Sequence, residues 1–176
     1  YTLEACLGIT PNSRSEPDFE GYEIKQFAVR DFQRFRAKSP ITLFTPEPTI
    51  GYYAEAGVRA FVERFGYPDT RGREDRRNFG GRFVHGRRLT KTGLTLSLRG
   101  ADAETGHILD ATGAIELVND EGVVAAGWPF ANLLGHWNRK HAEVAYVPSM
   151  KIGTETRYRF AGTVFLGYGT DFSRLM

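Results

Sequence analysis

The sequence has a single cysteine, Cys6, and no long apolar run among its 176 residues. One cysteine excludes a disulfide framework and a cysteine-rich zinc site. No window approaches the roughly 18 uncharged apolar residues of a transmembrane helix, so a membrane-spanning helix is excluded. Residues 1–9 lack the basic start and apolar centre of a signal peptide, so we expect a cytoplasmic protein. Because the chain begins at Tyr1 without an initiator methionine, we expect an excerpt of a longer protein.

What is present is the composition of an ordinary globular domain, with 41% apolar and 25% charged residues. The length suits one domain. Apolar periodicity predicts strands at residues 19–28, 41–45, 89–99, 114–118, 122–126, 144–148 and 157–167, and helices at the first few residues, 57–65, 129–143 and 171–176. This mixed order predicts an α/β or α+β fold, with a mixed central sheet flanked by helices.

Positive charge is concentrated in residues 64–91, which contain nine Lys or Arg against three Asp or Glu. That segment has a net charge of +6, whereas the rest of the chain has −4. One basic stretch on a near-neutral body favours contact with a polyanion. The alternative is a solvated loop with excess charge.

The segment from Asp18 to Lys25 has the residues of a metal-assisted hydrolytic site. If residues 22–27 form a strand, Glu23 and Lys25 project from the same face, about 7 Å apart at their Cα atoms. A bend at Gly21 can bring Asp18 beside them. Two carboxylates plus a substrate phosphate supply the oxygen ligands that Mg²⁺ prefers, and Lys25 would orient or deprotonate the attacking water. The alternative is a solvated strand face with a weak Glu–Lys pair.

The surroundings of these three residues resemble a known family. Residues 2–9, 17–19 and 22–25 are similar to the active-site region of the MvaI/BcnI-type restriction endonucleases and, more distantly, to the MutH-like nicking enzymes, both in the PD-(D/E)xK nuclease superfamily. Residues 41–48, 78–81, 94–96 and 136–141 match too, so the resemblance covers roughly residues 2–170. It implies a restriction-endonuclease-like fold in a single catalytic domain over residues 1–176, and it adds Glu4 to the catalytic set of Asp18, Glu23 and Lys25.

The resemblance also implies an activity. We expect a type II site-specific deoxyribonuclease that uses Mg²⁺, with Mn²⁺ as a substitute, held by Asp18 and Glu23. Its partner would be double-stranded DNA, nicked one strand at a time by a monomer at a short C/G-rich site such as CCWGG or CCSGG. In the full-length protein, another DNA-binding domain could be fused to it. Two alternatives are a catalytically silent DNA-binding module on a nuclease scaffold and a MutH-like enzyme directed by methylation or mismatches.

DNA contacts are expected in a loop at about residues 66–91 and on the helix at residues 129–143. Most loop arginines would bind phosphates, and one or two would read guanine edges, where a bidentate contact is geometrically favoured. The expected DNA-binding residues are Arg71, Arg73, Arg76, Arg77, His85, Arg87, Arg88, His136, Lys140 and His141. Trp137, the Phe61 and Phe65 stripe, and Cys6 are expected in the core.

Overall fold

A computed structural model describes residues 2–9, 17–43, 45–70, 72–73, 75–102, 104–154 and 157–168. The chain forms two compact units, one from residues 1–45 and 134–175 and the other from residues 46–133. No helix within the described ranges is long and apolar enough to cross a membrane. The expectation of a single catalytic domain over residues 1–176 stays a prediction, because two compact units can belong to one domain.

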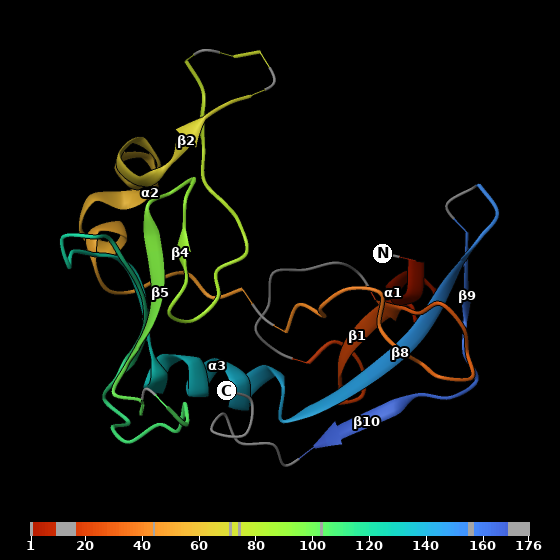
Figure 1. The fold of residues 1–176 in the computed structure, drawn as a ribbon. Helices are drawn as coiled ribbons and strands as arrows, with labels where there is room; N and C mark the ends of the chain where they lie inside the picture. The colour runs from red at the N-terminus through yellow and green to blue at the C-terminus, as the bar shows by residue number, and fades with distance from the viewer. Residues whose placement is uncertain are drawn as a thin grey trace. The chain divides into compact units, whose positions relative to one another are not determined.

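The first unit is built on a small mixed sheet (Figure 1). Its elements are α1 (Thr2–Cys6), β1 (Glu23–Ala28), β8 (Glu143–Ile152), β9 (Arg157–Phe160) and β10 (Phe165–Tyr168). β8 lies in the middle, with β1 parallel to it on one side. β9 and β10 run antiparallel on the other side, since Ser149 pairs with both Ala28 and Phe160. A parallel pair requires a long crossover connection, and here that connection contains the whole second unit.

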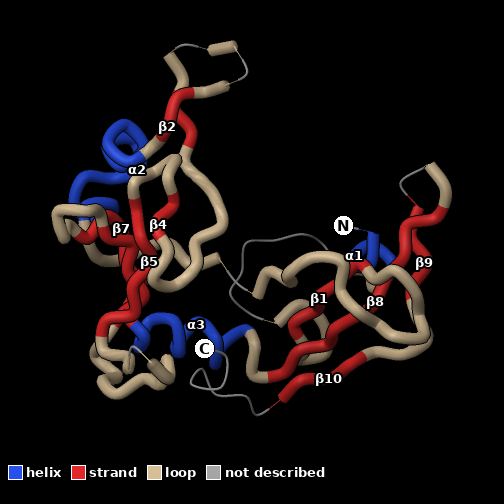
Figure 2. Tube along the Cα trace, viewed as in Figure 1, coloured by secondary structure: helices blue, strands red, loops and turns tan. Residues whose placement is uncertain are grey.

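The second unit has a helix, a short hairpin and an antiparallel sheet (Figure 2). The sheet has the order β4-β5-β6-β7, and β2 pairs with β3 separately. The bounds are α2 (Tyr52–Phe65), β2 (Tyr67–Pro68), β3 (Arg77–Asn78), β4 (Arg88–Leu89), β5 (Leu94–Arg99), β6 (Ala114–Val118) and β7 (Val124–Pro129). α3 (Phe130–Lys140) follows β7 directly and contains the boundary between the two units.

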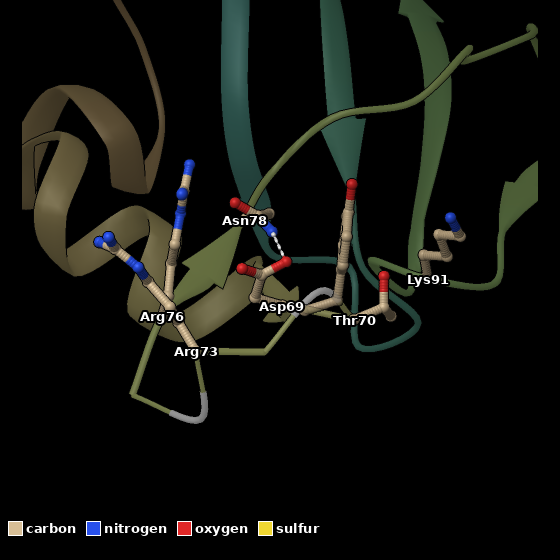
Figure 3. A pocket seen from close by; sticks show the side chains of 7 residues that line it. Asp69, Thr70, Arg73, Arg76, Asn78 and Lys91 are labelled. Carbon is tan, nitrogen blue, oxygen red and sulfur yellow. Dashed lines mark hydrogen bonds between the residues drawn. The ribbon is translucent and has the colours of Figure 1, made fainter.

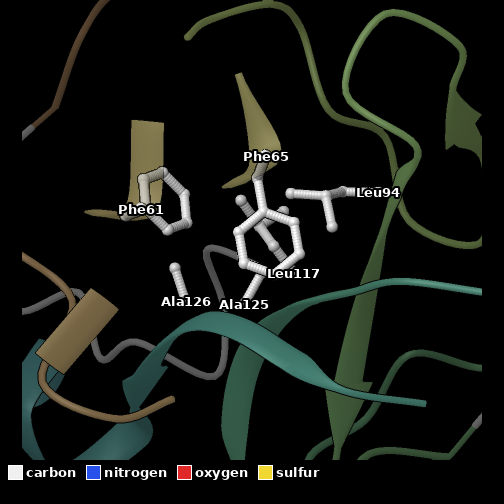
Figure 4. Close-up of a cluster of buried hydrophobic side chains, with 6 residues drawn as sticks. All are labelled: Phe61, Phe65, Leu94, Leu117, Ala125 and Ala126. Carbon is white, nitrogen blue, oxygen red and sulfur yellow. The ribbon is translucent and has the colours of Figure 1, made fainter. Parts of the chain in front are cut away.

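The core of the second unit forms between α2 and the sheet (Figure 4). Phe61 and Phe65 are four residues apart, so they project from one face of the helix. They pack with Leu94, Leu117, Ala125 and Ala126 from the strands. Burying each ring stabilises the fold by about 1.5–3 kcal/mol. Gly57 has φ 80° and ψ 168°, so the regular helix under this core starts after it, as the periodicity predicts.

The mixed α/β architecture, the hairpin of β6 and β7 and the core position of Trp137 confirm predictions from the sequence. Three predictions are wrong. The strand predicted at residues 89–99 is two antiparallel strands, β4 and β5, joined by a turn at residues 90–93. Residues 41–43 and 45 form no strand, since the prolines at 40, 46 and 48 lack the N–H that a sheet requires. Cys6 is exposed on the short helix α1. The predicted helix at residues 171–176 lies outside the described residues.

Candidate active site

A tight hairpin precedes β1 and sets the geometry of the candidate site. Phe19 and Tyr22 exchange two backbone hydrogen bonds, of 3.0 and 2.7 Å between nitrogen and oxygen. The two residues between them both have positive φ, 48° at Glu20 and 84° at Gly21. Positive φ at both central residues is the type I′ turn, whose twist matches that of a two-residue hairpin. Gly21 takes this conformation without a steric penalty, so the bend expected at this residue is a closed turn.

The hairpin brings Asp18 to the start of β1. One step beyond the Phe19–Tyr22 pair, a regular hairpin places residue 18 opposite residue 23, with their side chains on the same face. The Asp18 carboxylate accepts a hydrogen bond from the backbone N–H of Ile24, with Oδ2 3.2 Å from the nitrogen. The Asp18 carboxylate is therefore held by the backbone at the start of β1, one residue from Glu23.

Glu23 and Lys25 meet on the same face of β1. The Lys25 Nζ lies 2.6 Å from Glu23 Oε1, and the Glu23 side chain is only 3% exposed. Burial of a carboxylate this deep is costly unless a cation or hydrogen bonds compensate for it. The Lys25 side chain is 19% exposed, so the ammonium group compensates Glu23 and also reaches the surface. The pair is thus more deeply buried than the solvated strand face considered as the alternative.

Tyr146 of β8 is the neighbour of this pair across the sheet. It pairs with Lys25 in the parallel register, so both side chains project from the same face. Burial raises the pKa of Tyr146 above its ordinary value of 10.0. The phenol therefore stays protonated at neutral pH and offers a hydrogen-bond donor beside Lys25. No sequence pattern indicated Tyr146, because its proximity depends on pairing between residues more than a hundred positions apart.

The carboxylates available for a metal ion are Asp18 and Glu23. Within the described part of the chain, no group of three or more His, Cys, Asp and Glu gathers closely enough to hold a metal ion. Glu4, half-buried on α1, therefore does not join Asp18 and Glu23 in a three-acid site. Two carboxylates still suit Mg²⁺, which commonly binds one or two protein carboxylates, water and substrate phosphate.

The basic segment of the second unit is mostly exposed. Arg73, Arg76, His85 and Arg87 are exposed, and Arg71 lies outside the described residues. Two of the predicted DNA-binding arginines have partners within the protein. Arg88 forms a bidentate ion pair with Asp120, with its nearest nitrogen 2.7 Å from Oδ2. Arg77 donates a hydrogen bond to the carbonyl oxygen of Gly66.

Two pockets open within this basic segment. One has a volume of about 560 Å³ and is lined by Arg82, Val84, Arg87, Arg88, Leu89, Thr90 and Lys91. The other, of about 510 Å³, lies at the hairpin of β2 and β3 and also includes Lys91. Tyr67, Asp69 and Lys91 line this second pocket, and they lie in the predicted DNA-contacting loop at about residues 66–91 without being among the expected DNA-binding residues.

The predicted contact residues on and after helix α3 lie in different surroundings. His136 is exposed on it, whereas the side chain of Lys140 lies outside the described part of the structure. His141 is 3% exposed, and its ring centroid lies 4.9 Å from that of the buried Trp137. This burial suits a packing role, and DNA contacts from His136, Lys140 and His141 stay predictions.

Comparison with known proteins gives the family of the chain. Residues 1–176 match the MvaI/BcnI restriction endonuclease family, and the chain belongs to that family. The solved complex of the restriction endonuclease MvaI with its cognate DNA substrate is 23% identical and covers 90% of this chain, with a TM-score of 0.61. MvaI in the absence of DNA is 22% identical and covers 82% of this chain and 53% of its own, with a TM-score of 0.38. No curated protein matches the chain.

The likeness to the DNA complex of MvaI establishes the fold, a mixed α/β architecture of the MvaI type. This chain spans 59% of the length of the MvaI chain in that complex.

Proposed function

We propose that this chain is the catalytic part of a Mg²⁺-dependent, site-specific deoxyribonuclease that cuts double-stranded DNA at a short C/G-rich site such as CCWGG or CCSGG. The observation that carries the proposal is the convergence of Asp18, Glu23 and Lys25 on one hairpin and strand. Membership of the MvaI/BcnI family supports it. As a working enzyme it would be a cytoplasmic monomer and would accept Mn²⁺ in place of Mg²⁺.

Asp18 and Glu23 would hold the cation, and Lys25 would act on the water and the phosphate. A bound Mg²⁺ would lower the pKa of a water molecule and neutralise charge that develops on the phosphate. The Ile24 N–H holds the Asp18 carboxylate in place before any ligand arrives, so little reorganisation is required. Lys25 can exchange its ion pair with Glu23 for a contact to the incoming phosphate, because part of its side chain is exposed.

Glu4 has a separate place in the proposal. It lies in the same compact unit as the hairpin, on α1. Since it is not part of a three-acid metal group, we assign it to orienting water or the lysine rather than to the cation. Its replacement should therefore lower the cleavage rate without changing the affinity for Mn²⁺.

Cleavage of supercoiled plasmid in Mg²⁺ tests the proposal. We expect nicked and then linear DNA from the natural chain, and a rate about 10³-fold lower for Lys25→Ala. Lys38→Ala is the matched control, because Lys38 is an exposed lysine of the same unit and should leave the rate unchanged. DNA binding without cleavage in Mg²⁺ and Mn²⁺ would contradict the proposal and leave a silent DNA-binding module.

A further inference from the structure

The pocket beside the hairpin of β2 and β3 combines three kinds of side chain that a nucleotide requires. Its volume of about 510 Å³ lies in the range of small-molecule sites, about 300–1,000 Å³. The cationic side chains that line it are Arg73, Arg76 and Lys91. The aromatic side chain is Tyr67, the carboxylate is Asp69 and the amide is Asn78. Three cations against one carboxylate leave a net positive charge, which suits a ligand with a phosphate.

The wall of the pocket is fixed to the core of the second unit. Tyr67 pairs with Asn78 in the short antiparallel ladder, and the Asp69 N–H donates to the Arg76 carbonyl at 2.9 Å. Gly66 joins this ladder to α2, where a Cβ atom would lie only 2.3 Å from the Val62 carbonyl oxygen. The Gly66 N–H donates to that oxygen, with 2.9 Å between nitrogen and oxygen, and so anchors the hairpin to α2. Phe79, directly after Asn78, packs on the core residue Phe61 with ring centroids 4.6 Å apart.

Cationic side chains lie on both sides of the pocket, with a carboxylate and an amide between them (Figure 3). Asp69 and Asn78 lie side by side in the middle, and the Asn78 amide donates to Asp69 Oδ1 at 3.2 Å. Arg73 and Arg76 extend on one side of this pair and Lys91 lies on the other. Phosphates of one strand can therefore bind at the sides while a base faces the middle.

The middle of the pocket presents hydrogen-bond acceptors. A carboxylate can accept up to about four hydrogen bonds, so Asp69 can accept from a ligand as well as from Asn78. Because the Asn78 amide nitrogen donates to Asp69, its carbonyl oxygen is a second acceptor. Exocyclic amino groups of cytosine, adenine and guanine match these acceptors, whereas thymine has no amino group and offers only its N3–H beside two carbonyl acceptors, so we expect it to bind more weakly.

The base also has a surface to pack on. Tyr67 lines the pocket, and the Lys91 Nζ lies over its ring, 5.3 Å from the centroid, so a base that stacks on this face would displace the ammonium group towards a phosphate. Aromatic rings and arginine planes stack on any nucleic-acid base, with little preference among the four. Stacking thus contributes affinity, and the acceptors contribute the choice of base.

We propose that this pocket binds one nucleotide of the DNA, with its phosphates on Arg73 and Arg76 and an amino-bearing base against Asp69, and that it disfavours thymine. The inference rests on the proposed function only in taking DNA as the ligand. It assigns base discrimination to Asp69, a residue outside the predicted arginine contacts.

Binding of fluorescent 12-mers of dC, dA and dT, measured by anisotropy without divalent metal, tests the proposal. We expect the natural chain to bind dC and dA about tenfold more tightly than dT. Asp69→Ala should bring the three affinities together. Asp69→Asn, which replaces one of the two carboxylate oxygens with a donor NH₂ group, should shift the preference towards dT. Equal affinities for the natural chain, or a preference that survives both substitutions, would overturn the proposal.

The role of the two arginines is tested separately, by the salt dependence of oligonucleotide binding. Arg73→Gln with Arg76→Gln should weaken all three oligonucleotides equally and lower the salt slope by about 1.4, since each phosphate contact in a single strand contributes about 0.7. Arg59→Gln, a highly exposed arginine on α2, is the control and should change neither. A thermal melt of each variant establishes that it is folded. Lys25→Ala separates this inference from the proposed nuclease activity, because it should lower plasmid cleavage and leave the preference among the oligonucleotides, measured without divalent metal, unchanged.

Discussion

The hairpin and strand at residues 18–25 and the basic segment at residues 64–91 are both charged, and they differ in how their charges are held. Glu23 is almost wholly buried, and Asp18 accepts a hydrogen bond from the backbone. Most arginines of the basic segment are exposed, and Arg88 forms an ion pair with another side chain of the protein. Hydrolysis requires groups fixed to within a fraction of an ångström, whereas attraction of phosphate acts over a Debye length of about 8 Å. The difference is that expected between a reaction centre and a binding surface.

The largest effect should come from removing the charge of Asp18. Asp18→Asn keeps the size of the side chain and an oxygen that can accept from Ile24, so the hairpin should survive. We expect single-turnover cleavage in Mg²⁺ to fall about 10³-fold because a cation ligand loses its charge. Paramagnetic broadening of the Ile24 amide by Mn²⁺ should also weaken.

Glu20→Gln is the matched control for this substitution. Glu20 is an exposed carboxylate in the turn of the same hairpin. The Glu20→Gln variant should cleave DNA and bind Mn²⁺ as the natural chain does. Equal losses in both variants would show that general negative charge, and not a fixed ligand, matters in this region.

The second effect sharpens the difference between the two compact units. Phe61→Ala should lower the free energy of unfolding by about 3–5 kcal/mol, since Phe61 is 3% exposed in the core. Hydrogen exchange should accelerate more in β5, β6 and β7 than in β1 and β8. Val58→Ala, at an exposed position of the same helix, is the control. Uniform acceleration in both units would contradict separate cores.

The third effect concerns the basic segment as a surface. Replacing Arg76, Arg82 and Arg87 with glutamine should lower the salt slope of binding to a 20-base-pair duplex by about three. The control replaces Lys38, Arg59 and Lys151 with glutamine. These residues are exposed and lie outside the basic segment, so the control removes the same charge and should leave the slope near its original value. An equal change in both triple variants would show that DNA binding depends on the total charge of the protein and not on phosphate contacts in the basic segment.

The smallest effect concerns the paired arginine. The Arg88 guanidinium holds the pKa of the Asp120 carboxyl below its ordinary value of 3.8. Because the folded pKa is the lower one, this contribution to stability is present above pH 3.8 and is lost as the pH falls through the folded pKa.

NMR titration measures this effect. In Arg88→Ala the pKa of Asp120 should return towards 3.8, while Asp102, whose pKa is lowered mainly by the backbone N–H of Thr105, should be unchanged. An ordinary pKa for Asp120 in the natural chain would mean that Arg88 is available to DNA.

The candidate active site was predictable from the sequence because its geometry is local. The alternation of a strand places Glu23 and Lys25 on one face, and the turn at Gly21 brings the start of β1 back beside Asp18. The strand predicted at residues 41–45 failed for a local reason as well, since prolines on both sides remove the donors of a ladder.

The nucleotide pocket was not predictable in the same way. Strands of two residues, such as β2 and β3, give no periodicity, and Lys91 comes from the turn between β4 and β5. The parallel pairing that places Tyr146 beside Lys25 joins residues separated by the whole second unit. Contacts of this kind depend on tertiary structure that the pattern of one sequence does not specify.

Sequencing the DNA ends from a plasmid digest tests the nuclease proposal most directly. With Mg²⁺, the natural chain should leave 5′-phosphate ends that recur at one short C/G-rich sequence, and Lys25→Ala should leave almost none. Ends scattered without a common sequence would contradict site-specific cleavage, and equal yields from Lys25→Ala would contradict the reaction centre itself.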